Sequence, residues 1–193
     1  MKKLNIVAGL VMLACVMSSF PCVSFGADAK AKTKAVRLPD DQYYLDEGIV
    51  NFQRQDYDAA IESFSKALLA NPRYDKAYYN RGLAHFAKGN VAKSIADYTK
   101  AVEMNPKYAE AYFNRGFSHG VQGDIAAAIA DYSKAIKLNP KFAEAYNNRG
   151  AAYFLVKDYD KAAQDIAKAQ DLGFKVAPKL LQDLKKAPVG GNR

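Results

Sequence analysis

The most constraining feature of this chain is a repeat of fixed length. The tripeptide Asn-Arg-Gly and the dipeptide Asn-Pro each occur three times, and every copy lies 34 residues after the previous one. The Asn-Arg-Gly copies begin at Asn80, Asn114 and Asn148, and the Asn-Pro copies begin at Asn71, Asn105 and Asn139. A period of this length indicates one supersecondary unit stacked on copies of itself, because a single unit cannot bury its own apolar face.

The period divides the chain into four units, 41–74, 75–108, 109–142 and 143–176, and positions are numbered here from the start of each unit. Position 4 is tyrosine, position 8 is glycine and position 27 is alanine in every unit, and position 24 is large and apolar: Phe64, Tyr98, Tyr132 and Ile166. This pattern resembles the tetratricopeptide repeat (TPR). The resemblance implies an all-α, right-handed superhelical solenoid of four helix-turn-helix units, each with a helix A and a helix B.

The residue sizes predict how the two helices of a unit pack. Small residues at positions 8, 20 and 27 allow close approach, while large residues at positions 4, 17 and 24 fill the seams. Gly89 and Gly123 interrupt the connection from helix A to helix B, and each Asn-Pro ends a helix B. The fourth unit has Gly173-Phe174 in place of Asn-Pro, so we expect the array to end there.

A different element is predicted after the last unit. Pro178 stands where the first turn of a helix over 178–186 would begin, and Leu180, Leu181 and Leu184 share one face of that helix. Residues 177–193 are therefore interpreted as a capping helix followed by a disordered tail. Such a helix would cover the apolar side of the fourth unit.

The first 26 residues have the layout of a signal peptide. Lys2 and Lys3 precede an apolar run from Leu4 to Phe20, and small residues follow near Ala27. We expect cleavage that leaves a mature chain starting between Ala27 and Lys30, export, and a periplasmic or secreted location, with 27–40 as a basic flexible linker. A retained membrane anchor and a lipoprotein attached through Cys15 are the alternatives. Both cysteines of the chain lie in this segment, so the mature protein would contain no disulfide.

The charge of the chain argues against a nucleic-acid ligand. The formal net charge is +8, but units 41–176 hold 18 basic and 17 acidic residues, so the excess lies in the two tails. Binding of phosphate backbones requires a basic stripe on the folded surface. The basic tails leave open a contact with an anionic membrane surface.

The sequence does not predict an enzyme, a cofactor or a metal site. His85 and His119 both fall at position 11, which is a packing position of helix A, and neither a cysteine nor a group of carboxylates completes a ligand set. Phosphate-binding loops and nucleophile motifs are missing as well. An accessory subunit of an enzyme system remains the alternative from another functional class.

The resemblance instead implies a concave groove lined by the A helices. Positions 5, 6, 9, 12 and 13 of that surface supply apolar side chains and a row of asparagines, namely Tyr79, Leu83, Phe86, Phe113, Phe117, Phe154, Leu155, Asn80, Asn114 and Asn148. Exposed apolar patches mark interaction sites, and a carboxamide pairs well with a peptide backbone. Alternatively, the asparagines only help successive repeats to pack.

We therefore predict a non-catalytic scaffold of the bacterial cell envelope that binds an extended peptide or partner segment in this groove. Some TPR proteins hold an acidic C-terminal tail with a clamp of Lys and Asn residues. This chain lacks that clamp, because positions 5 and 9 are mostly apolar. A membrane-tethered lipoprotein that assembles an envelope complex is the alternative.

One ion pair is also predicted. Arginine at position 7 and aspartate at position 23 occur together in the second, third and fourth units, whereas the first unit has Glu47 and Ser63 instead. Joint presence and joint absence indicate contact between helices A and B of one unit. Loss of one partner would then cost more than loss of an exposed ion pair.

Overall fold

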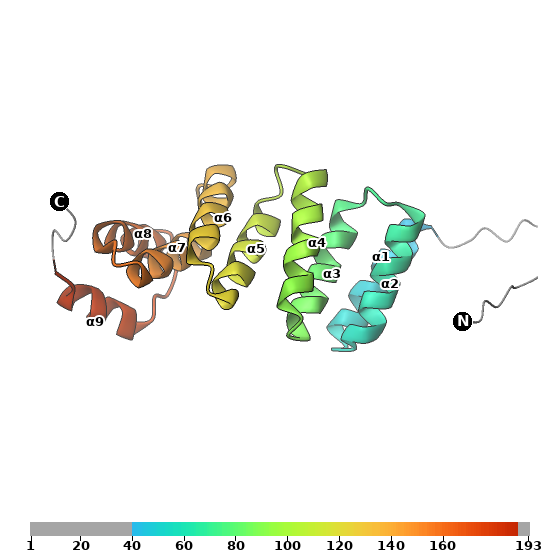
Figure 1. The fold of residues 1–193 in the computed structure, drawn as a ribbon, viewed down its shortest axis with the longest axis horizontal. Coiled ribbons are helices and arrows are strands. Elements are labelled where there is room, and N and C mark those ends of the chain that lie inside the picture. The colour runs from blue at the N-terminus through green and yellow to red at the C-terminus, as the bar shows by residue number, and fades with distance from the viewer. Residues whose placement is uncertain (1–39, 189–193) are drawn as a thin grey trace, which may run out of the picture. The chain divides into compact units, whose positions relative to one another are not determined.

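The computed structural model describes residues 40–188, so the predicted signal peptide, nearly all of the basic linker and the last five residues of the tail lie outside it. Within this range the chain forms only helices (Figure 1). Their bounds are α1 Asp41–Gln53, α2 Tyr57–Ala70, α3 Asp75–Ala87, α4 Val91–Met104, α5 Ala109–Gln122, α6 Ile125–Leu138, α7 Ala143–Leu155, α8 Tyr159–Asp171 and α9 Pro178–Lys186.

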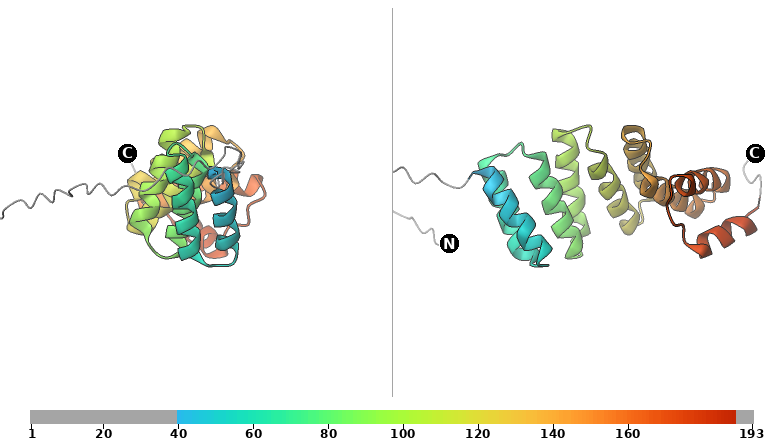
Figure 2. Two further views of the ribbon diagram at one scale, coloured as in Figure 1. Left: turned by 90° about the vertical axis from the view of Figure 1, so that its right-hand side faces the viewer. Right: turned by 180° about the vertical axis from the view of Figure 1, so that it is seen from behind.

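Each of the four units contributes one pair of helices, and each pair packs on the next. Helices α1, α3, α5 and α7 are the A helices, and α2, α4, α6 and α8 are the B helices. Seen from the front and from behind, the pairs from α1/α2 to α7/α8 follow one another in chain order (Figures 1 and 2). The predicted all-α TPR solenoid with a C-terminal helix is confirmed.

The turns form as the sequence predicts. Gly89 and Gly123 follow α3 and α5 with φ values of +78° and +86°, a conformation that glycine adopts without steric cost. Asp56, Asp124 and Asp158 then cap the N-termini of three B helices, each accepting a hydrogen bond from the backbone N–H three residues later.

The core lies between the helices of each pair and at the seams between pairs. The residues at positions 20 and 27 are almost completely buried in every unit, and so are the large side chains at position 24. Glycine at position 8 is needed for this approach: a Cβ atom added to Gly82 would lie 2.7 Å from Cε1 of Tyr98. Each buried position-24 side chain contributes about 1.5 to 3 kcal/mol to stability.

Helix α9 covers the end of the fourth unit. It begins at Pro178 and ends at Lys186, as the sequence predicts, and its three leucines pack against Ile166, Ala169 and Val176. Val176 is buried in the connection that leads to α9.

The arginines of position 7, called here the arginine ladder, make the predicted ion pairs. Arg115 donates from Nε to Oδ2 of Asp131 at 2.8 Å and from Nη2 to Oδ1 at 2.7 Å. Equivalent two-bond pairs join Arg81 to Asp97 and Arg149 to Asp165. The aspartate side chains are 8 to 9% exposed, so these pairs are largely shielded from water.

Each arginine of the ladder also contacts the preceding repeat. The Nη1 atoms of Arg81, Arg115 and Arg149 donate to hydroxyl groups at position 25 of the unit before, which are those of Ser65, Thr99 and Ser133. One guanidinium therefore links three helices. In the first unit, Ser63 donates to Glu47 at 2.8 Å instead, so that unit keeps a polar contact without a cation.

Candidate functional site

The apolar side chains predicted to line the groove fall into two structural groups. The first group lies at position 5, and each ring packs against the last residue of its own unit, just before the next A helix begins. The ring of Tyr79 lies 4.8 Å from that of Tyr108, and the ring of Phe113 lies 4.8 Å from that of Phe142, measured between centroids. Both side chains are half-buried, so part of each ring packs in the seam between repeats and part is accessible on the surface.

The second group is more open and lies further along the A helices. The rings of Phe86 and Phe117 are in contact, with centroids 5.5 Å apart, although the two residues come from successive repeats. Phe154 contacts Tyr159 of its own repeat at 5.4 Å, and Leu83 is half-buried. Phe117 is 42% exposed and Leu155 is 65% exposed, so the third and fourth repeats present apolar surface to solvent.

The three asparagines of position 6 do not form a uniform row. Asn80 donates from Nδ2 to the carbonyl oxygen of Lys76 in its own helix. Asn114 donates to the hydroxyl of Tyr79 in the preceding repeat at 2.9 Å. Asn148 accepts from its neighbour Asn147 and lies beside the hydroxyl of Tyr132.

Differences at position 5 explain these three environments. Only Tyr79 carries a hydroxyl there, and position 5 of the units that precede Asn80 and Asn148 holds Leu45 and Phe113. The packing role that was the alternative for the asparagines is therefore present at Asn114. Its second N–H and its carbonyl oxygen are not used in that bond.

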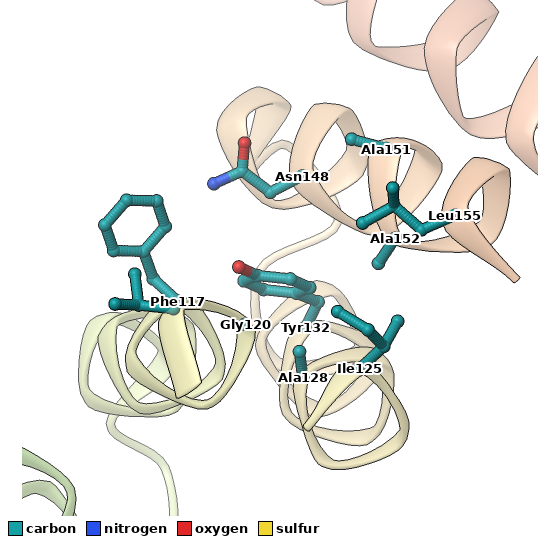
Figure 3. A pocket seen from close by; sticks show the side chains of 10 residues that line it. Phe117, Gly120, Ile125, Ala128, Tyr132, Asn148, Ala151, Ala152 and Leu155 are labelled. Carbon is teal, nitrogen blue, oxygen red and sulfur yellow. The ribbon is translucent and has the colours of Figure 1, made fainter. Parts of the chain in front are cut away.

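A pocket opens between α5, α6 and α7, where the third and fourth repeats meet. Figure 3 shows Phe117 from α5, Tyr132 from α6 and Leu155 from α7 around it. Its volume is about 240 Å³, and its lining carries no charged side chain. The polar groups in the wall are the Tyr132 hydroxyl and the Asn148 carboxamide. Burial raises the pKa of Tyr132 to about 12, so the hydroxyl stays protonated at neutral pH.

The absence of one side chain creates this pocket. Position 12 is phenylalanine in the other three units, as Phe52, Phe86 and Phe154, but it is Gly120 in the third. A Cβ atom added to Gly120 would find its nearest neighbours 3.9 Å away, at Ala128 and Tyr132. Gly120 was not among the site residues predicted from the sequence, although comparison of position 12 across the four units identifies it.

The two histidines lie at the packing position where the sequence places them. His85 has Nε2 3.9 Å from Oδ2 of Asp97, beyond hydrogen-bonding distance, and burial lowers its pKa. The buried Nδ1 atoms of His85 and His119 have no hydrogen-bond partner within residues 40–188. In the same part of the chain, no group of three or more metal-ligating side chains comes together.

The helices described here are all too short or too polar to cross a lipid bilayer.

Comparison with protein families agrees with the geometry. Models described as "Tetratricopeptide repeat" match residues 45–109, 97–130 and 143–172, and one described as "TPR repeat" matches residues 121–157. These matches together run through all four helix pairs. The chain belongs to the tetratricopeptide repeat family, whose members are protein interaction modules.

Several solved structures have the same fold. A crystal structure of MamA is 28% identical, with a TM-score of 0.67, and the match covers 69% of this chain and 78% of MamA. The first TPR domain of Spaghetti (RPAP3), bound to an HSP90 peptide, is 26% identical with a TM-score of 0.60, covering 61% and 93%. The Arabidopsis OM64 TPR domain shares the fold at 21% identity and a TM-score of 0.57, covering 58% and 93%. A search of curated proteins found no match.

Proposed function

We propose that this protein is a non-catalytic scaffold that binds an extended peptide segment of a partner protein along the concave face of its A helices. The observation that supports this most is the exposed apolar surface formed by Phe117, Val121 and Leu155 on successive A helices. Large apolar side chains that remain exposed together in a folded domain mark interaction sites. Elsewhere in the groove the aromatic rings already contact one another, so binding requires little further ordering of these side chains.

The chemistry of the groove favours recognition through the peptide backbone and apolar side chains. Asn114 retains an N–H and a carbonyl oxygen beyond its bond to Tyr79, and this pair matches the acceptor and donor of a peptide unit. Lys76 lies in the second repeat, whereas Glu110 and Glu144 lie in the third and fourth, so a ligand with the opposite polarity has a preferred direction. The RPAP3 domain, which is similar in fold and whose structure contains an HSP90 peptide, supports the proposal of a peptide ligand.

We place this activity in the bacterial cell envelope. The support is the signal-peptide layout of residues 1–26, which lie outside the described structure. N-terminal sequencing of the protein recovered from the envelope fraction tests this location. A mature chain that begins between Ala27 and Lys30 is expected, and a lipidated chain that begins at Cys15 contradicts it.

The binding function is tested by site-specific photo-crosslinking followed by calorimetry. A photoreactive amino acid replaces Phe117 in the groove or, as the control, Leu69, which is 83% exposed on α2 and lies on a B helix. The partner captured only from the groove position is then titrated as a synthetic peptide. We expect Asn114→Ala combined with Phe117→Ala to weaken its binding by about 2 kcal/mol or more, as loss of a hot spot does.

Leu69→Ala is the matched control, since it also removes an exposed apolar side chain. It should leave affinity unchanged. If the groove double variant keeps its circular dichroism spectrum and binds every captured partner as well as the parent does, the concave face is not the binding surface.

A further inference from the structure

We infer that the pocket beside Gly120 is a specificity site that receives one uncharged aromatic side chain, Phe or Tyr, of the bound partner segment. This inference rests on the proposed function of the groove and names the side chain that the groove selects.

The second repeat shows which kind of side chain fits at the equivalent location. There, position 12 is Phe86, and its ring contacts Phe117, which is position 9 of the following repeat. The pocket is lined by the corresponding residues one repeat later, Gly120 at position 12 and Ala151 at position 9. The chain therefore fills this location with its own ring in one repeat and leaves it empty in the next.

Two independent departures from the repeat pattern enlarge the same space. Gly120 replaces phenylalanine, and Ala151 replaces the larger Ile49, Leu83 and Phe117 of the other units. Glycine within a helix costs up to about 1 kcal/mol relative to alanine, so Gly120 in the last turn of α5 is not the most stable choice.

The size and polarity of the pocket define the ligand class. An apolar protein cavity of about 150 Å³ binds benzene, and this pocket measures about 240 Å³. Because no charged side chain lines it, a charged ligand group would be desolvated without compensation. The Tyr132 hydroxyl and the Asn148 carboxamide in the wall offer hydrogen bonds to a phenol or to the backbone next to the ring.

The pocket is also accessible to a partner. Phe117, Val121 and Leu155 form its rim and are 42%, 55% and 65% exposed, so an incoming chain meets apolar surface before it reaches the pocket. Those three residues belong to the surface on which the proposed function depends. An aromatic ring of a peptide bound in the groove could therefore enter the pocket while the rest of the peptide contacts this surface.

The first test uses a small probe and does not require the natural partner. The probe is N-acetyl-L-phenylalaninamide, with N-acetyl-L-alaninamide as its control, and the readout is the methyl NMR signals of Ala128, Ala152 and Ile125. We expect saturable shifts with the aromatic probe alone. Gly120→Phe should weaken this binding by about tenfold or more, because the introduced ring occupies the site.

A second variant keeps this test interpretable if Gly120→Phe does not fold. Ala151→Phe fills the pocket from the opposite wall with the residue that the third unit carries at position 9, and it should have the same effect. Wild-type protein that shows no shift at these methyls, or filled variants that shift as the wild type does, would overturn the assignment.

The second test separates this inference from the proposed function. The partner peptide captured through position 117 is titrated against Gly120→Phe and against Phe117→Ala. Loss of affinity in both supports the inference, whereas loss only in Phe117→Ala leaves the groove function standing and refutes the pocket. No loss in either refutes the function itself. A concentration-dependent dimer of the wild type that Gly120→Phe abolishes would assign the pocket to a second copy of this chain, against our proposal.

Discussion

The second and third repeats have the same helices and the same ion pair, yet they present different surfaces. In the second repeat Phe86 fills the space between helices, and its ring packs on Phe117. In the third repeat Gly120 leaves that space open as a pocket of about 240 Å³. The shared residues thus build the scaffold, and the residue that breaks the pattern builds the candidate site. Substitutions in the scaffold and in the candidate site should therefore have different effects.

The largest effect is expected from the arginine ladder. Arg115→Met should lower the free energy of unfolding by about 3 to 5 kcal/mol, because it leaves the buried Asp131 carboxylate without its cation. Urea denaturation of Arg115→Met, Asp131→Leu and the double variant gives the coupling energy. A coupling energy of zero would show that the pair does not stabilise the fold.

The first repeat supplies the control for that cycle. Ser63→Ala removes the hydrogen bond to Glu47, whose side chain is only half-buried. The expected loss is smaller, about 1 kcal/mol. Equal losses in the two repeats would mean that the arginine ladder adds nothing beyond an ordinary hydrogen bond.

Substitution of glycine by alanine should change stability in opposite directions at Gly82, which belongs to the scaffold, and at Gly120, which belongs to the candidate site. Gly82→Ala should destabilise the protein by about 1 to 3 kcal/mol, through overpacking against Tyr98. Gly120→Ala should stabilise it by up to about 1 kcal/mol, because alanine favours the helix and its Cβ atom meets nothing closer than 3.9 Å. Thermal unfolding measures the stability change in both variants. A change in the same direction for both would contradict this difference between scaffold and site.

A smaller, pH-dependent effect is expected from His85. Burial lowers its pKa, the charges of Arg81, Lys88 and Lys93 act in the same direction, and Asp97 opposes them. As the pH falls below about 6.5, the unfolded chain therefore takes up the proton first, and stability is lost until the lowered pKa is passed.

His85→Asn should reduce this pH dependence, and the first repeat already carries asparagine, Asn51, at the same position. Urea denaturation at pH 7.5 and at pH 5.5, values chosen about one unit on either side of the ordinary histidine pKa, measures the difference. A stability difference between the two pH values that is identical in the variant and the parent would exclude His85 as its source.

Much of the fold could be predicted from the sequence because the packing constraints recur every 34 residues. Glycine at position 8 and the large residue at position 24 meet within one unit, so the pattern of a single unit predicts their contact. The Arg115–Asp131 pair could be predicted for the same reason. Its third contact, to Thr99, was missed because it crosses between units.

The candidate site was harder to predict because it depends on departures from the pattern. The asparagines were interpreted as one row, but the hydroxyl of Tyr79 engages Asn114, and Phe113 offers no hydroxyl to Asn148. Likewise, a search for side chains that bind could not find Gly120, whose contribution is the space left by a missing ring. Such features follow only from comparing neighbouring repeats.

The most direct test of the account is the free energy of unfolding of Gly120→Phe relative to Gly120→Ala. Alanine has the higher helix propensity of the two residues, so any greater stability of Gly120→Phe must come from its ring. If the pocket is an unfilled ring site, Gly120→Phe should be more stable than Gly120→Ala by about 1.5 to 3 kcal/mol, the gain from burying a phenylalanine side chain. Equal or lower stability of Gly120→Phe would show that the space does not accept a ring, and that the third repeat has no site for one.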